Sequence, residues 1–449
     1  MAVAAEEIAS RLGDVLDGKV SDLRRLSGGA SRTTSSFDLR GPDGTTRSLI
    51  LQQGRGSLPG QGQRAHVEAA LLTAARAAGV PVPGVVAAGV PDGLPAGWLV
   101  VERLDGESIP RKILRDPEWS EARARLAAQC GRALAAIHGI DPAAIEGLPP
   151  RDPFDDPCSF LDALGEVRPA LELGVRWLEV NRPPPRPPTT VHGDFRTGNF
   201  LIGRDGLGAV LDWELAHIGE AAEDVGWLCA PAWRFGGRGR VGGFGDLATL
   251  LQAYAAAGGE QLDERRVHWW EVYATVKWAV ICALQASAHL SGRTRSIELV
   301  AIGRRVCESE WDLFTLIGVV PAHDEPPPEI TRASPAPLAP FGRPTLEELV
   351  EALGEHLEGL TSEQTDRGSR FEARIAANVA GMVDRQLGLA PAVAAAHARR
   401  LARLGFDDDA ALVAAIRRGT FDDQWGELGA PLAASARDQL LVANPSYLA

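Results

Sequence analysis

The sequence predicts an α+β fold with a strand-rich small lobe, a mainly helical large lobe and a further all-α domain. Short strand patterns recur over residues 21–104, whereas helical periodicity dominates residues 119–317. Eight prolines from Pro321 to Pro344 interrupt that periodicity, which resumes beyond them. The expected divisions are a small lobe at 1–104, a large lobe at 105–318, a linker at 319–344 and a helical domain at 345–449.

Composition places the chain among large cytoplasmic enzymes. Its 449 residues are 45% hydrophobic and 23% charged, which is typical of globular proteins with more than one domain. The net charge of −13 argues against a nucleic-acid or anionic-membrane partner, because both need a basic surface. Glu6 and Glu7 lie where a signal peptide carries basic residues, and no apolar run is long enough to span a membrane. The cysteines lie too far apart to predict a zinc site or a disulfide framework.

The small lobe is expected to begin with a helix over residues 4–17, whose apolar residues recur at spacings of three and four. Strands at 21–26 and 33–39 follow, joined by a glycine-rich turn. Such a turn leaves backbone N–H groups free to approach a phosphate, although a plain hairpin turn is the alternative. The candidate phosphate-binding residues of the turn are Gly28, Gly29 and Ser31. The remaining elements of the lobe are strands at 47–52, 84–89 and 97–104 and a helix at 64–78.

The large lobe is expected to be built mainly from long helices. The same periodicity predicts helices at 119–140, 159–180, 262–290 and 294–317. A proline-rich connector at 183–188 leads from the second helix into a polar stretch.

That polar stretch, residues 191–214, has the side-chain spacing that phosphoryl transfer requires. In the kinase template, an Asp accepts the proton of the acceptor hydroxyl, and an Asn five residues later holds Mg²⁺ beside a second Asp. Asp194 and Asn199 have this spacing. A predicted hairpin that turns at Gly206 returns Asp212 to the level of Asn199. Asp and Asn near a hairpin also commonly make turns, so the spacing alone leaves both interpretations open.

The complete motif carries a resemblance to a known family. His192 to Asn199 reads H-G-D-F-R-T-G-N, and Asp212 begins D-W-E. Together they resemble the aminoglycoside phosphotransferase and choline kinase-like family, distant relatives of the protein kinases. The stretches LSGGASRTTSSFD, VLDWELAHIGE and EDVGWLC are similar to bacterial phosphotransferase-family proteins related to kinase domains fused to acyl-CoA dehydrogenases. The resemblance covers residues 20 to 318 and implies a two-lobed protein kinase-like fold.

The resemblance also implies a role for each polar residue. Asp194 would orient and deprotonate the acceptor hydroxyl, and His192 would brace the catalytic loop. Asn199 and Asp212 would hold Mg²⁺, with ATP or GTP bound between the lobes. Asp224 would cap backbone amides of the catalytic loop from behind.

The usual phosphate-binding cation is missing from its expected position. Kinases normally carry a lysine on the third strand, paired with a helix glutamate. Glu68 matches that glutamate, but the strand carries Gln52, which brings no charge to the phosphates. The only lysines of the chain are Lys19, Lys112 and Lys277. We expect Arg55, or else Arg32, to supply the charge, with Arg55 favoured as the partner of Glu68.

The other binding residues are expected at two places. Backbone groups from Glu102 to Leu104 would bind the adenine or guanine edge, and an ordinary edge strand is the alternative. The glycine-rich loop at 230–245 would border the acceptor site, where its arginines suit an anionic substrate; a solvated loop is the alternative. The candidate acceptor-binding residues are Glu214, Trp233, Arg234 and Arg238.

The C-terminal region is expected to be an all-α bundle. Thr345 and Glu348 form a capping-box pattern at its start, and about five helices extend to Leu441. The expected interruptions are Gly388, Gly405 and Gly419. The region resembles a helical domain of unknown function that accompanies this branch, and a protein partner could bind to it.

These observations favour an ATP- or GTP-dependent and Mg²⁺-dependent phosphotransferase that acts on a hydroxyl of a small molecule. The resemblance suggests a hydroxyacyl-CoA acceptor, and aminoglycosides, choline and amino sugars remain alternatives. The rival interpretation is a nucleotide-binding pseudokinase with a regulatory or scaffold role, in which Gln52 marks lost catalysis. The presence of Asp194, Asn199 and Asp212 favours the enzyme.

Overall fold

The chain forms two compact units, each assembled from separate stretches of sequence. The computed structural model describes residues 5–26, 32–54, 61–89, 97–153, 161–162, 165–319, 328, 345–363 and 367–448. The first unit contains residues 1–151 and 184–271, and the second contains residues 152–183 and 272–449. The stretch 152–183 therefore belongs with the C-terminal helices and not with its neighbours in sequence. Among the described residues, no helix combines the length and the apolar character needed to cross a membrane.

The small lobe of the first unit is an antiparallel sheet of five strands in the order β1-β2-β3-β5-β4. The strands are β1 (Lys19–Arg25), β2 (Arg32–Arg40), β3 (Thr46–Gly54), β4 (Val85–Gly89) and β5 (Trp98–Glu102). They confirm the predicted strands to within a few residues at each end. The predicted glycine-rich turn between β1 and β2 lies outside the described residues.

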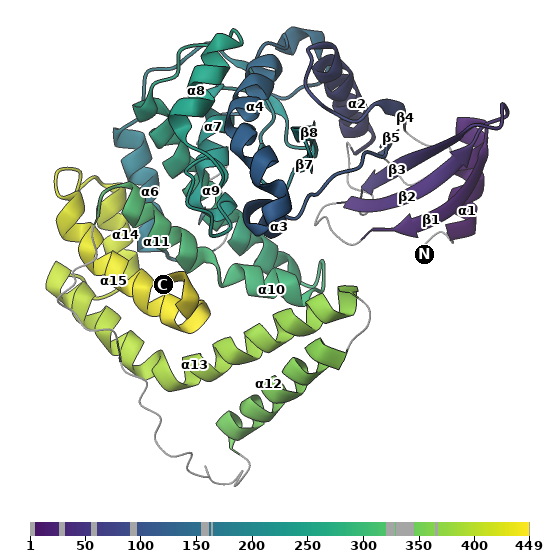
Figure 1. Ribbon diagram of the computed structural model, residues 1–449. Coiled ribbons are helices and arrows are strands. Elements are labelled where there is room, and N and C mark those ends of the chain that lie inside the picture. The colour runs from purple at the N-terminus through teal and green to yellow at the C-terminus, as the bar shows by residue number, and fades with distance from the viewer. Residues whose placement is uncertain are drawn as a thin grey trace. The chain divides into compact units, whose positions relative to one another are not determined.

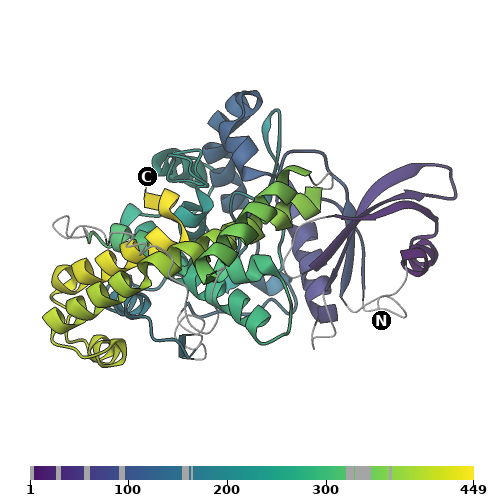
Figure 2. The ribbon, with the colours of Figure 1, turned by 90° about the horizontal axis from the view of Figure 1, so that it is seen from below.

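One helix covers each face of this sheet (Figures 1 and 2). Leu12 of α1 (Ala5–Leu16) packs in a buried cluster with Leu49 and Leu51 of β3. Because successive side chains of a strand alternate between faces, Ile50 and Gln52 point to the other face. That second face is covered by α2 (Gln61–Ala77). The sheet therefore buries an apolar core on one side and presents a mixture of apolar and polar side chains on the other, among them Gln52.

The rest of the first unit surrounds a short hairpin that bears the predicted metal site. Its helices are α3 (Pro110–Arg115), α4 (Ser120–His138), α7 (Ala222–Cys229), α8 (Leu247–Ala256) and the beginning of α9 (Glu264–Leu290). Its strands are β6 (Thr189–Val191), β7 (Phe200–Gly203), β8 (Gly206–Val210) and β9 (His217–Gly219), paired as β6-β9 and β7-β8. Gln129 of α4 accepts a hydrogen bond from Leu207 N at 2.9 Å and donates one to Asp205 O at 2.8 Å. The turn of the β7-β8 hairpin is therefore fixed by α4.

The regular elements of the second unit, as far as the structure describes it, are all helices. Its helices are α6 (Pro169–Val180), the end of α9, α10 (Ile297–Gly303), α11 (Val306–Leu316), α12 (Leu346–Glu363), α13 (Arg367–Leu404), α14 (Asp409–Arg417) and α15 (Trp425–Ala443). Leu173 of α6 and Phe314 of α11 share one buried cluster with Leu412 of α14 and Leu428 of α15. Ion pairs support it, since Arg176 pairs with Asp422 through Nη2 and Oδ2 at 2.5 Å. The helices beyond residue 345 therefore complete a core that begins at α6.

Some predicted helix boundaries are wrong for identifiable reasons. The helix expected over 159–180 is interrupted before Pro169, where α6 begins, since proline fits the first turn of a helix and breaks its interior. Residues 161–162 are helical and 165–168 are not, and residues 159–160 and 163–164 lie outside the described residues. The helix expected over 294–317 is divided into α10 and α11 after Gly303. At Gly303 a Cβ atom would lie 2.5 Å from the Cβ of Ala286, so this close approach to α9 requires glycine.

The C-terminal bundle follows its predicted pattern in part. Thr345 N donates to Glu348 Oε2 at 2.8 Å and Glu348 N donates to Thr345 Oγ1 at 3.4 Å, which confirms the capping box. Gly405 and Gly419 follow the ends of α13 and α14 with positive φ angles of 85° and 77°. The interruption expected at Gly388 is wrong, because α13 continues through it. Four α-helices, not five, occupy the described residues from 345 onward.

Candidate active site

The catalytic loop follows β6 and is held by a buried carboxylate. Asp224 of α7 accepts hydrogen bonds from His192 N at 2.8 Å and Gly193 N at 2.9 Å, and His138 Nε2 lies 3.2 Å from its Oδ2. Burial opposes ionisation of Asp224, but the hydrogen bond from His138 and the nearby donors hold its pKa below the ordinary value. Gly193 has a φ of 79°, and a Cβ there would lie 2.3 Å from Leu215 O. The arrangement matches the capping role expected for Asp224.

Asp194 lies in this loop and is oriented by three side chains. Its Oδ2 accepts a hydrogen bond from Asn199 Nδ2 at 2.6 Å. Its Oδ1 accepts from Arg196 Nε and Trp227 Nε1, both at 2.8 Å. Asp194 is 9% exposed, so the carboxylate is nearly buried but still reaches the surface. A carboxylate held this firmly is positioned to accept a proton from a bound hydroxyl.

His192 connects the catalytic loop to the strand that leads to Asp212. Its Nε2 lies 3.1 Å from Leu211 O, and Asp194 N lies 3.2 Å from its Nδ1. The carbonyl requires an N–H at Nε2, and the amide requires a lone pair at Nδ1. Burial lowers the pKa of His192, which favours the neutral imidazole that these two bonds require. Both ring nitrogens of His192 are therefore used to hold the catalytic loop against Leu211.

The β7-β8 hairpin brings Asn199 and Asp212 together as the sequence predicts. Leu211 N donates to Asn199 O at 2.8 Å, so the chain leaving β8 runs beside the chain entering β7. Asp212 then adopts a φ of 65°, a left-handed conformation that Asp tolerates better than most residues. Burial and the charges of Glu214, Asp194 and Glu68 raise the pKa of Asp212 to about 7. A bound cation would offset the negative charge around Asp212, so this carboxyl is a candidate metal ligand.

The donor chemistry of this pair fits Mg²⁺. The Nδ2 group of Asn199 is directed to Asp194 O at 3.0 Å as well as to its carboxylate, so the amide oxygen is the atom left to bind a metal. Mg²⁺ usually takes only one or two protein oxygens and completes its shell with phosphates and water. The described residues contain no cluster of three His, Cys, Asp or Glu that would form a metal centre without a nucleotide. Asn199 and Asp212 would therefore hold an ion that arrives with the nucleotide.

A cavity beside these residues is large enough for a nucleotide. It has a volume of about 550 Å³. Gln52 and Glu68 line it from the small lobe, and Asn199 and Asp212 line it from the hairpin. Gly28, Gly29, Ser31 and Arg55 of the predicted nucleotide site lie outside the described residues.

Glu68 pairs with Arg32, the second of the two arginines that the sequence suggested. Glu68 is 3% exposed, and its Oε2 lies 2.5 Å from Nη1 of Arg32 on β2. Nε of the same arginine lies 2.9 Å from Glu214 Oε2. Among the described residues Glu68 therefore pairs with Arg32, which the neighbouring strand brings to α2, whereas the expected partner Arg55 lies outside them.

Glu102 and Leu104 both line the cavity, at the end of β5. Glu102 N already donates to Gly84 O at 2.9 Å, and its carboxylate accepts from Gly84 N and Arg76 Nη1, both at 3.1 Å. The amide of Glu102 is thus occupied. Hydrogen bonds to a purine edge would come from the backbone beyond it, toward Leu104.

The predicted acceptor residues have different surroundings. Trp233 is 5% exposed, and the guanidinium of Arg196 lies 4.4 Å from its ring centre, which places Trp233 beside the residues that hold Asp194. Arg234 instead binds Cys229 O and the buried Glu271, with Nη2 2.6 Å from Oε1. Arg238 lines a different hollow, together with Arg240. The structure therefore brings Trp233 to the catalytic loop, whereas the guanidinium of Arg234 is engaged in an internal ion pair.

Two side chains that contact Asp194 were not identified from the sequence. Arg196 lies inside the catalytic motif, and its position two residues after Asp194 is the signal that could have identified it. Trp227 reaches Asp194 from α7 across 33 residues of sequence. No spacing rule predicts such a long-range contact.

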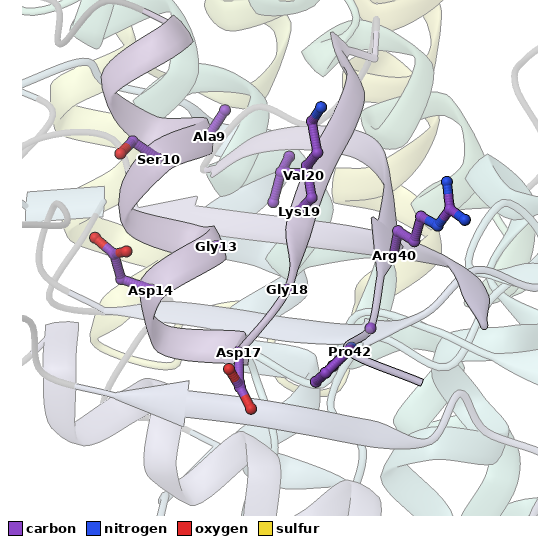
Figure 3. Close-up of a pocket in the computed structure, with 11 residues that line it drawn as sticks. Ala9, Ser10, Gly13, Asp14, Asp17, Gly18, Lys19, Val20, Arg40 and Pro42 are labelled. Atoms are coloured by element: carbon purple, nitrogen blue, oxygen red, sulfur yellow. The ribbon is translucent and has the colours of Figure 1, made fainter. Parts of the chain in front are cut away.

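A further hollow lies in the small lobe, between α1 and the strands that follow it. Figure 3 shows that Asp14, Asp17, Lys19 and Arg40 surround it. None of the candidate catalytic or metal-binding residues lines this hollow. It is a shallow surface feature of the lobe, separate from the cavity that contains Asp212.

Comparison with known structures identifies the fold. A putative aminoglycoside phosphotransferase from Ralstonia eutropha is 19% identical, with a TM-score of 0.54 and coverage of 70% of this chain and 98% of that one. APH(4)-Ia, an aminoglycoside phosphotransferase solved with AMP-PNP and hygromycin B, is 17% identical, with a TM-score of 0.47 and coverage of 70% and 98%. The first of these matches shows that this chain has the aminoglycoside phosphotransferase fold.

Sequence comparisons extend this result. Acyl-CoA dehydrogenase family member 10 of Mus musculus is 40% identical over 63 residues, which span 14% of this chain and only 6% of that protein. Residues 363–447 match a domain of unknown function, DUF6285. The model of the phosphotransferase enzyme family matches residues 22–276, which include every candidate catalytic and metal-binding residue described above. This chain therefore belongs to the phosphotransferase enzyme family.

Proposed function

We propose that the protein is an ATP- or GTP-dependent kinase of the cytoplasm that transfers the γ-phosphoryl group to a hydroxyl of a small molecule. The observation that carries the proposal is the joint placement of Asp194, Asn199 and Asp212. Asn199 binds the Asp194 carboxylate at 2.6 Å, and its backbone binds Leu211, next to Asp212, at 2.8 Å. A base and a metal pair in this order are the parts that phosphoryl transfer needs.

Each residue has a distinct task in this reaction. Asp194 accepts a hydrogen bond from the acceptor hydroxyl, turns its oxygen toward the γ-phosphorus and takes the proton as the new P–O bond forms. Asn199 keeps the Asp194 carboxylate in place, and His192 fixes the loop against Leu211. Asn199 and Asp212 would hold Mg²⁺, which would neutralise charge on the phosphate oxygens.

The surroundings of Asp194 favour an acceptor that carries negative charge. Arg196 binds Asp194 and stacks on Trp233, which places a cation and an aromatic face next to the proposed base. A polycationic aminoglycoside would be repelled by this arginine, whereas an acyl-CoA carries phosphates that such a cation attracts. Among the acceptor classes, we therefore favour a hydroxyacyl-CoA over aminoglycosides and choline.

The test is a turnover assay with Mg²⁺ and ATP or GTP against a panel of hydroxyacyl-CoAs, aminoglycosides and choline. Asp194→Asn should lower turnover by about 10²–10⁴-fold with nucleotide affinity little changed. Asp205→Asn is the matched control, because Asp205 lies in the exposed turn of the same hairpin. Undiminished transfer by Asp194→Asn would refute the role of Asp194. If the wild type binds nucleotide but phosphorylates no acceptor, the pseudokinase interpretation replaces the proposal.

A further inference from the structure

The proposed nucleotide cavity is lined by the uncharged Gln52 of β3 and, on the neighbouring strand β2, by Arg32. In the β2-β3 pair, Thr34 lies opposite Gln52 and Arg32 lies opposite Gly54. Arg32, Thr34 and Gln52 all line the cavity, because alternate residues of neighbouring strands share a face. Arg32 is thus one alternation step along the same face from the position where related enzymes place a lysine.

Arg32 makes the contacts that such a lysine would make. Its Nη1 lies 2.5 Å from Glu68 of α2, and its Nε lies 2.9 Å from Glu214, two residues after Asp212. The side chain of Arg32 is 15% exposed, so the guanidinium is held inside the cavity wall. Burial opposes its charge, but Glu68 and Glu214 raise the pKa of Arg32, and it remains a cation.

The charges around Arg32 require a cation at this place. Arg32 pairs with Glu68 and Glu214, and the charge of Asp212 also acts on it, so three carboxyl groups surround its guanidinium. A bound nucleotide would add the negative charges of its phosphates. Among the described residues that line the cavity, Arg32 and Arg103 are the cations, and Arg32 is the one that contacts these acids. A guanidinium carries five N–H donors, so it can bind a phosphate while keeping a bond to Glu68.

We propose that Arg32 on β2 is the phosphate-binding cation of this enzyme and that Glu68 orients it, in place of a lysine on β3. The inference rests on the proposed nucleotide-dependent function. In the structure Arg32 bridges Glu68 and Glu214; with nucleotide bound, it exchanges the Glu214 contact for the phosphates. Charge-assisted hydrogen bonds with a forked donor suit this task, since phosphate oxygens accept them readily.

The test measures the binding of Mg²⁺-ATP, Mg²⁺-ADP and adenosine by calorimetry on the full chain. Arg32→Gln should weaken ATP and ADP binding by about 10- to 150-fold, the strength of a charge-assisted contact, and leave adenosine binding unchanged. Arg40→Gln is the matched control, because Arg40 lies on the same strand with an exposed side chain. It should leave all three affinities unchanged.

A rescue variant makes the result specific. Adding Gln52→Lys to Arg32→Gln returns a cation to β3, so we expect most of the lost phosphate affinity to return. Arg32→Lys keeps the charge and should bind ADP more tightly than Arg32→Gln does. If Arg32→Gln fails to fold, the ADP affinity of Arg32→Lys is compared with that of the wild type instead. Wild-type ADP affinity in Arg32→Gln would overturn the inference while the proposed function stands. A wild type that binds no nucleotide at all would instead count against the proposed function.

Discussion

Asp212 combines an unusual backbone conformation with an unusual charge state. Its φ is 65°, and burial among Glu214, Asp194 and Glu68 raises its pKa to about 7. A carboxyl group whose folded pKa lies above its unfolded value costs stability as the pH rises between the two values. Without a divalent ion, the protein therefore carries an electrostatic cost at Asp212 at alkaline pH, which a bound cation would remove.

We expect Asp212→Asn to separate metal binding from folding. Asparagine tolerates the same left-handed conformation but brings no charge, so Mg²⁺-nucleotide turnover should fall by about 100-fold or more. In a chelator at pH 8, the variant should unfold at the same or a higher temperature than the wild type. This gain should shrink as the pH falls below 7 and vanish only near pH 4, where the carboxyl is also protonated in the unfolded chain. Thermal unfolding measures the change in stability, and a turnover assay with Mg²⁺-nucleotide measures the loss of activity. Unchanged turnover would mean that Asp212 does not bind the metal.

Asp224 supports the active site without touching the region where substrates would bind. Its fully buried carboxylate accepts hydrogen bonds from the backbone amides of His192 and Gly193. Asp224→Ala leaves these donors unsatisfied, so we expect unfolding to become easier by about 1–3 kcal/mol for each. Denaturant unfolding measures the change. Asp246→Ala is a useful comparison, because Asp246 caps α8 from the exposed surface and should cost less.

At the scale of elements, the sequence predicted local geometry correctly where one residue type determines the backbone conformation. The turn at Gly206 has a φ of 110°, and it places Asp212 beside Asn199 as the sequence predicts. The Arg32 to Glu68 pair could not be derived in this way, because it joins residues 36 positions apart through a strand and a helix that are placed by tertiary packing. The contact of Trp227 with Asp194 was not predicted from the sequence for the same reason.

The capping box of α12 provides a local prediction. Thr345 and Glu348 each bind the backbone amide of the other. Thr345→Ala removes one of these bonds and should destabilise the start of α12 by about 0.5–2 kcal/mol. Hydrogen exchange should show faster exchange of the amides in the first turn of α12 and unchanged exchange in α4. Unchanged protection at α12 would show that packing against α13, not the cap, holds this end.

At the scale of the whole molecule, the boundary expected after residue 318 is a poor place to cut. Leu173 and Phe314 are both fully buried in the cluster that α14 and α15 complete. The two buried side chains alone would expose apolar surface worth about 1.5–3 kcal/mol each if these helices were removed. We therefore expect a fragment ending at residue 318 to aggregate or to unfold at a markedly lower temperature than the full chain.

The measurement is expression and thermal unfolding of the fragment beside the full chain. A second fragment that ends at residue 404 and lacks α14 and α15 should behave like the first, because these helices carry the shared core. A fragment ending at residue 318 that is monomeric and as stable as the full chain would refute the expectation. It would also support the domain division that the sequence suggests.

The shared core also bears on how the chain folds during its synthesis. Arg176 of α6 pairs with Asp422, which lies 246 residues later in the chain. At about 5–20 residues per second, a ribosome takes about 12–50 s to make that stretch, which is long compared with helix formation. For that interval the apolar face of α6 has emerged without its final partners. We therefore expect the nascent chain to be open to chaperone binding at α6 until α14 and α15 emerge.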